Sequence, residues 1–360
     1  MKVLHVINCL VRGGGAEKFV LDLVLELKRK GVEVEILSIL PPPMDKQDFR
    51  ILLEQAGIPI HILTQRNLYS WRNIFYLYSF FNTHTYDIVH GHLFPVLYFC
   101  AIACRKKMKL VYTEHSTDNR RRHIILFKII DKLIYRRYHK IVCISNKVQE
   151  LLLRHTGRIN SAIIPNGINI SVFQNAEPLS ILEQNKDLRW VTMTARFVEG
   201  KDYITVFKAL QLLDDNVHLL CVGTGPLLEE HRKYCEKNNL SSRVHFLGLR
   251  NDIPQILKAS DVIVLSSEHE GFSLSMLEAM ASGRPFIASD VPGILDLIKN
   301  YTDLFPLGQE EVLAEYISRL LTDGEYRNRI IEKNLKFASK YDISEVSGRY
   351  MSLYDRLLGY

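Results

Sequence analysis

An apolar run at residues 262–265 constrains the fold of this chain more than any other feature. Four consecutive residues of this kind predict a strand covered on both faces, which is typical of a parallel sheet. A polar loop follows, and Ser273 or Ser275 can cap a helix that ends before Gly283. Residues 285–288 predict the next buried strand. Because ligands of open α/β sheets bind at the carboxyl ends of strands, we expect the loop to carry a binding site.

Two glutamates, Glu270 and Glu278, stand eight positions apart across this loop and helix start. Eight steps of about 100° bring the second within roughly a quarter turn of the first, so both can face one cleft. Backbone N–H groups of residues 271–273 lie between them at a helix N-terminus, where anions bind. A ligand that carries both hydroxyls and phosphates would use both features. The alternative is a Ser275–Glu278 capping box, with Glu270 as a solvated loop acid.

Composition indicates a two-domain globular protein. The chain has 360 residues, of which 47% are hydrophobic and 24% charged, and this balance argues against disorder. Six cysteines without C-x-x-C spacing indicate reduced thiols rather than disulfides or a zinc site. No apolar run reaches the ~18 residues of a membrane span, and residues 3–7 predict a first strand rather than a signal peptide. We therefore expect a cytoplasmic location.

The first loop, at Gly13, Gly14 and Gly15, lies in a strand–helix–strand unit and suggests a dinucleotide site. The G-x-G-x-x-G pattern fails, however, because Lys18 occupies the position of the third glycine. There is also no acid just past the second strand, at residues 32–39, to bind a ribose. A nicotinamide or flavin enzyme is thus the weaker interpretation.

Polar residues follow several later strands as well. DIVHGH at residues 87–92 and TEHS at residues 113–116 place His90, His92 and His115 at or near the ends of predicted parallel strands, where side chains can reach a cleft. In the second half, Arg196 and Lys201 follow a strand at residues 190–194. Together they could clamp a diphosphate. In isolation, such an R-x4-K pair would more simply be solvated surface.

In order along the chain, the motifs GGAE, DIVHGH, TEHS, IPNGI, R-x4-K, VGTGP, FLG and E-x7-E resemble those of family four glycosyltransferases, the glycosyl transferases group 1. The resemblance implies the α/β GT-B fold, with two Rossmann-like doubly wound domains facing a central cleft. We expect these domains at residues 1–170 and 189–342, a linker at 171–188, and a helix at 343–360 that crosses back to the first domain. The chain departs from the family pattern after Asp290, where the glycine-rich segment is shorter.

The resemblance also implies an activity, that of a retaining glycosyltransferase, of the hexosyltransferase type, which transfers a sugar from a nucleotide-diphosphate sugar to a glycan or lipid-linked hydroxyl in cell-surface polysaccharide or glycolipid synthesis. His115, Glu270, Arg196 and Lys201 would be catalytic. The donor would contact Gly14, Gly15, Arg196, Lys201, Gly223, Gly271, Phe272, Ser273 and Glu278. No cofactor is expected, since the nucleotide sugar is a donor substrate. No catalytic metal is expected either, because no aspartate pair with metal-ligand spacing occurs in the predicted site. The alternatives are an epimerase or phosphorylase of the same fold, or a basic module that binds membrane or nucleic acid.

Basic residues are concentrated in one part of the chain. Residues 101–140 contain 12 Lys and Arg against 3 Asp and Glu, although the net charge of the whole chain is only +6. Residues 123–138 predict a basic amphipathic helix that could lie on an anionic membrane, whereas in the alternative its apolar face packs on the core. Nucleic acid is not expected as a partner. The aromatic residues of the helix predicted at 73–83 are expected to be core.

Overall fold

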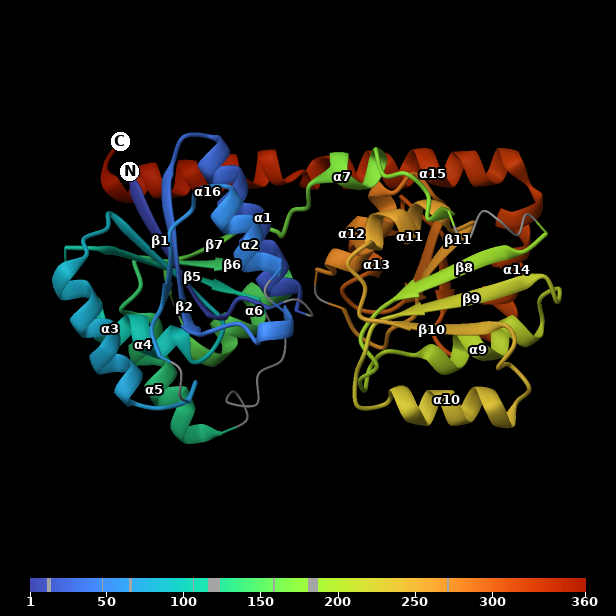
Figure 1. Ribbon diagram of the computed structural model, residues 1–360, viewed down its shortest axis with the longest axis horizontal. Helices are drawn as coiled ribbons and strands as arrows, with labels where there is room; N and C mark the ends of the chain where they lie inside the picture. Colours follow the sequence, from blue (N-terminus) through green and yellow to red (C-terminus); the bar gives the residue numbers. More distant parts are fainter. Residues whose placement is uncertain are drawn as a thin grey trace. The chain divides into compact units, whose positions relative to one another are not determined.

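The computed structural model describes residues 1–11, 14–46, 48–64, 67–105, 107–115, 124–157, 159–180, 187–270 and 272–360. The chain forms two compact units (Figure 1). Unit 1 contains residues 1–167 together with 343–360, and unit 2 contains residues 168–342. Both units are α/β structures built on a parallel sheet.

Unit 1 contains a parallel sheet in the order β3-β2-β1-β4-β5-β6-β7. Its strands are β1 (Lys2–Cys9), β2 (Glu33–Leu40), β3 (Ile60–Ile62), β4 (Ile88–His92), β5 (Lys109–Glu114), β6 (Lys140–Cys143) and β7 (Ser161–Ile163). The chain adds strands outward from β1 in one direction and then from β4 in the other. The strand order therefore reverses between β1 and β4, which is where doubly wound sheets bind ligands.

Helices cover both faces of this sheet (Figure 1). They are α1 (Gly15–Arg29), α2 (Asp48–Gln55), α3 (Arg72–Thr83), α4 (Val96–Ala103), α5 (Ile125–Tyr135), α6 (Asn146–Thr156) and α16 (Ile343–Leu358). On one face, α1 packs against α2 and the C-terminal α16. On the other, α4 packs between α3 and α5, and α5 also packs against α6. The apolar run that contains α4 is thus a short buried helix of the unit 1 core.

Unit 2 repeats the plan, with a parallel sheet in the order β10-β9-β8-β11-β12-β13. Its strands are β8 (Arg189–Thr194), β9 (Val217–Val222), β10 (Val244–Gly248), β11 (Val262–Leu265), β12 (Phe286–Asp290) and β13 (Leu304–Pro306). Here the order reverses between β8 and β11. Its helices are α7 (Ile170–Gln174), α9 (Tyr203–Gln211), α10 (Leu228–Lys237), α11 (Ile253–Ala259), α12 (Leu274–Ala281), α13 (Leu295–Ile298), α14 (Glu310–Thr322) and α15 (Gly324–Ala338).

The element boundaries differ from the predicted ones in three places. The last strand of unit 1 is β7, which begins and ends slightly earlier than the strand and turn expected at 163–169, and it ends before Pro165, which has no N–H to extend the ladder. The segment predicted as a linker, 171–188, lies within unit 2, where α7 packs against α11 and α12. After the shortened glycine segment the chain forms β13, whose Pro306 pairs with Asp290 of β12.

The prediction that the aromatic residues of α3 are core is wrong for most of them. Only Asn73, Leu77 and Phe81 of this helix are buried, whereas Phe75 and Tyr78 are exposed. The helix is aromatic on all sides, and a helix in contact with a single neighbouring layer can bury only one stripe at i, i+4 spacing. Among the described residues, no helix is both long and apolar enough to cross a membrane.

Candidate active site

At the switch point of unit 2, two loops leave adjacent strands and are fastened together. The loop after β8 and the loop after β11 are joined by backbone hydrogen bonds from Asp202 N to Ser266 O, at 3.1 Å, and from Glu268 N to Gly200 O, at 2.9 Å. The Ser266 hydroxyl also donates to the Asp202 carboxylate at 2.9 Å, and Asp202 caps α9. The predicted site residues of both loops therefore stand on one braced framework.

Lys201 and Glu270 form an ion pair across these loops. The Lys201 ammonium also donates to the Ser267 hydroxyl at 3.2 Å, and that hydroxyl donates to Glu270 at 3.1 Å. Ser267 is fully buried and its N–H donates to the Ser289 hydroxyl, at 3.0 Å. The structure thus brings two predicted site residues into direct contact, although sequence reasoning assigned them to different parts of the ligand.

Arg196, the other predicted cation, has different surroundings. It lies in the same loop as Lys201 but is exposed. Within the described part of the chain its guanidinium has neither an ion pair nor a hydrogen bond. An arginine presented without a protein partner beside the switch point can bind phosphate oxygens in a bidentate manner.

Gly223 lets a third loop approach the Arg196 loop. A Cβ at Gly223 would lie 2.1 Å from the backbone oxygen of Ala195, and one at Gly225 would lie 2.2 Å from that of Phe197. The close approach allows Phe197 N to donate to Thr224 O at 3.1 Å. The VGTGP motif is therefore explained by loop packing, whatever contact Gly223 makes with a donor.

The start of α12 carries the remaining predicted residues of unit 2. Ser273 caps the helix and accepts from Met276 N, while Phe272 is buried against Tyr341. Ser275 lies inside the helix, so the alternative of a Ser275–Glu278 capping box is wrong. Glu278 lies on α12 and is half-buried. Gly271 lies outside the described residues.

The switch point of unit 1 carries the first glycine loop. Gly14 is the N-cap of α1 and Gly15 its first residue, while Gly13 lies outside the described residues. A Cβ at Gly14 would lie 2.0 Å from a carboxylate oxygen of Glu17, whose flexible side chain folds back over the loop. The glycine leaves room for this carboxylate at the helix N-terminus, where negative charge is stabilised.

Beside this loop lies a cluster of four histidines, formed by His5 of β1, His90 and His92 of β4, and His115 just after β5. His5 Nδ1 lies 3.0 Å from His92 Nε2, and His92 Nδ1 lies 3.2 Å from His115 Nε2. Sequence reasoning missed His5 because it stands in mid-strand. The signal was a lone polar residue in an apolar strand, and β1 pairs with β4 so that His5 lies opposite His90.

Burial keeps these histidines neutral. It lowers the pKa of His5 and of His115 to about 3, and holds the pKa of His90 and His92 well below the ordinary value. His90 is anchored from α16, because its Nδ1 lies 2.6 Å from the Tyr354 hydroxyl. The ligand atoms of His5, His90 and His92 lie within 4.8 Å of one another, a grouping that could hold a metal ion. Both nitrogens of His90 already have hydrogen-bond partners, however, since its Nε2 lies 2.7 Å from the Thr113 hydroxyl.

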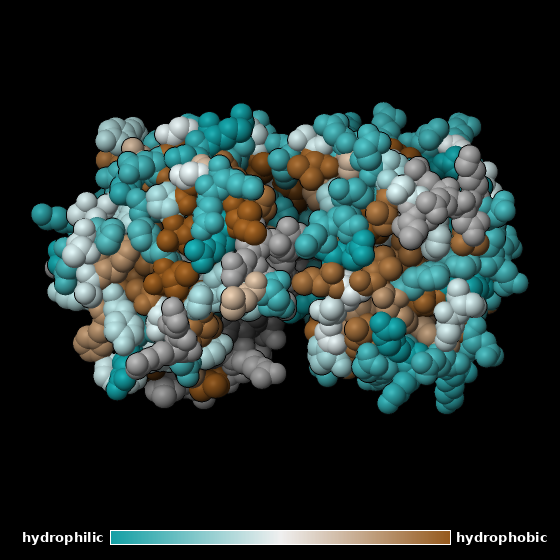
Figure 2. Space-filling model, in the orientation of Figure 1, coloured by the Kyte–Doolittle hydropathy of each residue, from teal (hydrophilic) through white to brown (hydrophobic). Residues whose placement is uncertain are grey.

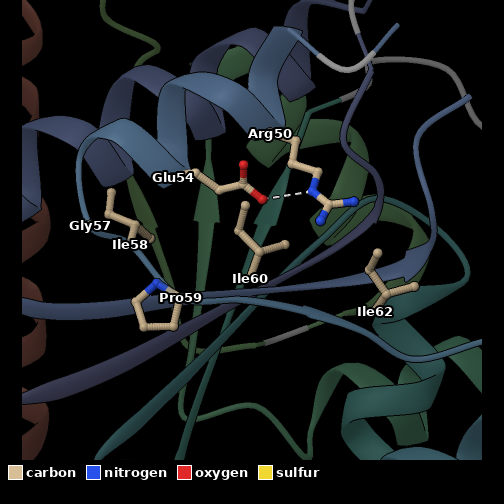
Figure 3. A pocket seen from close by; sticks show the side chains of 7 residues that line it. All are labelled: Arg50, Glu54, Gly57, Ile58, Pro59, Ile60 and Ile62. Carbon is tan, nitrogen blue, oxygen red and sulfur yellow. Dashed lines mark hydrogen bonds and ion pairs between the residues drawn. The ribbon is translucent and has the colours of Figure 1, made fainter. Parts of the chain in front are cut away.

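A separate pocket of about 350 Å³ lies at the edge of unit 1 (Figure 3). It is lined by Arg50, Glu54, Gly57, Ile58, Pro59, Ile60 and Ile62. Arg50 Nε and Glu54 Oε1 form an ion pair at 2.8 Å. Strand β3 is two strands away from β1 in the sheet. This pocket is not part of the switch-point site.

Two doubly wound units with polar loops at both switch points are the architecture of the GT-B glycosyltransferases, and comparison with known proteins gives the same class. Residues 177–337 match the family described as Glycosyl transferases group 1, and residues 13–172 match Glycosyltransferase Family 4. The chain belongs to these glycosyltransferases and is an enzyme of that class, as its motifs predicted.

Individual relatives agree with this assignment. The chain is 29% identical over 289 residues to the UDP-Gal:alpha-D-GlcNAc-diphosphoundecaprenol alpha-1,3-galactosyltransferase of Escherichia coli, with 74% of this chain and 73% of the relative covered. It is 28% identical to the N,N'-diacetylbacillosaminyl-diphospho-undecaprenol alpha-1,3-N-acetylgalactosaminyltransferase of Campylobacter jejuni, with 63% of each chain covered. Its fold is similar to that of Anabaena HepE in complex with UDP-glucose, with a TM-score of 0.85, 22% identity, and 99% and 100% of the two chains covered.

Proposed function

We propose that the protein is a retaining, metal-independent hexosyltransferase that transfers a sugar from a nucleotide-diphosphate sugar to a hydroxyl of a lipid-linked or glycan acceptor, in cell-surface polysaccharide or glycolipid synthesis. The observation that carries this proposal is Arg196, which is exposed and has no partner among the described residues, beside the Lys201–Glu270 pair at the switch point of unit 2. The guanidinium would bind the diphosphate and stabilise the charge that builds on the leaving group.

Lys201 would act together with Arg196. An ammonium has three N–H donors, and Ser267 and Glu270 engage two of them, which leaves one for a phosphate oxygen. Glu270, fixed by the same contacts, would accept from a sugar hydroxyl. Glu278 would accept from the ribose, the amides of Gly271, Phe272 and Ser273 would lie alongside, and His115 would line the reacting face.

We propose UDP as the carrier and a sugar linked to a diphosphate lipid as the acceptor. The E. coli relative is named for a UDP-galactose donor and a diphosphoundecaprenol acceptor, the Campylobacter relative for a similar acceptor, and the Anabaena structure for UDP-glucose. The test is a panel of UDP- and GDP-sugars with a polyprenyl diphosphate sugar, read by release of the nucleoside diphosphate. Release from none of them would contradict the proposal.

The stereochemistry and the metal requirement need separate readouts. We expect the anomeric proton coupling of the product to match that of the donor, and we expect EDTA to leave the rate unchanged. An inverted product would contradict retention, and loss of activity that Mg²⁺ or Mn²⁺ restores would contradict metal independence. Isomerised donor without transfer would instead favour the epimerase alternative.

We also propose that unit 1 binds an anionic membrane through α3 and α5. On α5, Ile129 and Leu133 are 63% and 62% exposed, whereas Asp131 of the same helix is buried. The alternative in which the apolar face of α5 packs on the core is therefore wrong for these residues, since the helix turns aliphatic side chains outward and a carboxylate inward. Apolar residues that project beside basic ones are typical of interfacial helices.

Helix α3, which packs on the other side of α4, extends this surface. Trp71 beside α3 and Phe75 on α3 are 65% and 61% exposed, and the Arg105 guanidinium lies 5.9 Å from the ring centre of Tyr78. Exposed basic residues of α5 and its end complete the α3–α5 surface, namely Lys128, Lys132, Arg136 and Arg137. Figure 2 shows hydrophobic residues scattered among hydrophilic ones over this part of unit 1. Lys106 and Arg120, Arg121 and Arg122 lie outside the described residues.

Sedimentation with liposomes tests the membrane proposal. We expect binding to anionic vesicles at low salt that weakens at high salt, since each basic residue near the surface contributes about 1 kcal/mol. The double substitution Ile129→Ser with Leu133→Ser should reduce it, whereas Leu212→Ser, an exposed leucine of unit 2, should not. Equal binding to neutral and anionic vesicles, or none, would contradict this proposal without affecting the glycosyltransferase assignment.

A further inference from the structure

Three of the clustered histidines form a continuous chain across adjacent strands. β1, β4 and β5 are neighbours in the sheet, and His5, His92 and His115 lie on or just after them. The two ring-to-ring contacts, 3.0 Å and 3.2 Å, are both of hydrogen-bond length. His92 therefore uses one nitrogen toward His5 and the other toward His115.

Such a chain couples the tautomers of its members. A neutral imidazole has one N–H donor and one acceptor nitrogen, so each of the two contacts requires an N–H from one side only. If His5 carries its proton on Nδ1, then His92 and His115 must carry theirs on Nδ1 as well. The reverse arrangement places all three protons on Nε2.

The two ends of the chain decide between these arrangements. His5 Nε2 and His115 Nδ1 are buried and have no hydrogen-bond partner within the described ranges. His5 is fully buried in mid-strand, so a proton on its Nε2 would stay permanently unpaired, and orphaned buried N–H groups are rarer than orphaned acceptors. His115 as a residue is only half-buried and lies just past the carboxyl end of β5, the edge of the sheet at which doubly wound folds bind ligands.

We propose that His5 and His92 are positioning residues that fix the proton of His115 on Nδ1, so that this ring presents a neutral N–H donor to an oxygen of the bound sugar substrate. An oxygen of the ligand would then accept from His115 Nδ1–H, the donor that the three histidines leave without a partner. This inference rests on the proposed function for its ligand, but the tautomers themselves belong to the free protein.

Nitrogen NMR of the histidine-labelled protein without ligand is the first test. Two-bond proton–nitrogen correlations at pH 7.5 distinguish protonated from unprotonated ring nitrogens. We expect His5, His92 and His115 all to carry the proton on Nδ1. A His115 proton on Nε2, or different tautomers at His5 and His115, would overturn the proposal, and neither result depends on catalysis.

Substitutions at His92 are the second test. In His92→Phe we expect His115 to lose its single tautomer and kcat to fall about 10- to 100-fold, while affinity for the nucleoside diphosphate stays the same. His92→Asn places an amide N–H where His92 Nδ1 stood, so it can still donate to His115 Nε2 and should restore much of the loss. His218→Phe is the matched control, because His218 Nδ1 makes a similar contact of 2.9 Å with His245 Nε2 in unit 2, away from the three histidines of unit 1.

The outcomes separate the two proposals. Equal loss of kcat in the Asn and Phe variants, with the His115 tautomer unchanged in both, would overturn the proposed positioning role of His92. If His92→Phe fails to fold, the wild-type spectrum still decides. A wild-type protein with the expected tautomers but no transfer from any nucleotide sugar would contradict the proposed function and leave the positioning role intact.

Discussion

Arg196 and Lys201 are five residues apart, yet the fold treats them differently. Lys201 is held by Ser267 and Glu270, so its position is set before a ligand arrives. Arg196 is exposed, and ordering its side chain on a ligand costs rotamer entropy that Lys201 has already lost. We therefore expect Arg196 to supply adaptable, charge-assisted contacts and Lys201 to supply a fixed point charge.

Arg196→Ala should lower kcat/KM by an amount equivalent to about 2 to 4 kcal/mol of activation free energy, because a contact to the developing phosphate charge is lost. Arg196→Lys should recover only part of this, since an ammonium cannot bind two oxygens in the planar bidentate geometry. Steady-state kinetics on folded variants provide the measurement. Arg189→Ala is the control, because Arg189 pairs with Asp261 at the opposite end of β8. Near wild-type turnover in Arg196→Ala would show that the arginine is misassigned.

The two glutamates should separate by calorimetry with the nucleoside diphosphate alone. Glu278→Gln is expected to weaken binding because a charged acceptor for the ribose hydroxyls is lost. Glu270→Gln should not weaken it, since the substitution leaves the Lys201 charge unpaired and available to phosphate, but it should impair transfer. Unchanged nucleotide affinity in Glu278→Gln would contradict its ribose role.

At the scale of elements, the site of unit 2 depends on how closely loops approach one another. The loop after β9 packs against the loop after β8 only because residues 223 and 225 lack a Cβ. Gly223 also has φ +145, which side-chain-bearing residues rarely adopt. The glycine turn thus positions Arg196 indirectly, by supporting the loop that carries it.

Three glycine-to-alanine variants separate backbone conformation from steric contact. Gly308→Ala, at a position with φ +79 and open space around it, should lower the free energy of unfolding by about 1 kcal/mol. Gly225→Ala should cost more, because the added Cβ would meet Phe197 O. Gly223→Ala should be the most destabilising, because it combines a positive φ with a backbone contact. Urea unfolding of unit 2 measures the order. Equal losses at Gly308 and Gly223 would show that the loop moves aside.

At the scale of the whole molecule, unit 1 encloses a core of neutral histidines that ties both of its sequence segments together. Tyr354 and Tyr350 of α16 reach this cluster, the first by its bond to His90 and the second through the Thr113 hydroxyl at 3.3 Å. The C-terminal helix therefore supports the cluster through two contacts that span 264 and 237 residues of sequence. Protonation of these buried histidines would be unfavourable, because the charge would lose its hydration.

The free energy of unfolding should fall as the pH drops below the pKa of histidine in the unfolded chain. The pKa of His5 and His115 is about 3 in the folded state against 6.5 for the ordinary group, so between these values the unfolded chain binds more protons and is favoured. The loss should reach about 2 kcal/mol per histidine at pH 5. Chemical denaturation at pH 7.5 and pH 5 measures it, and His5→Phe should reduce the slope by about one proton. A pH-independent free energy over this range would contradict burial of the cluster.

The two doubly wound units, the strand ends that carry polar residues and the family could all be predicted from the sequence. Strand and helix periodicities are local, and the motifs stand at loops whose order along the chain is fixed. The sequence also predicted Arg196, Lys201, Glu270 and His115 as site residues. The contacts of Lys201 with Glu270, 69 positions away, and of His5 with His92, 87 positions away, could not be predicted and appear only in the folded structure. The folded structure also shows that α3 and α5 expose apolar side chains. The reason is that periodicity tells which face a residue lies on, whereas strand order and loop approach decide what that face meets.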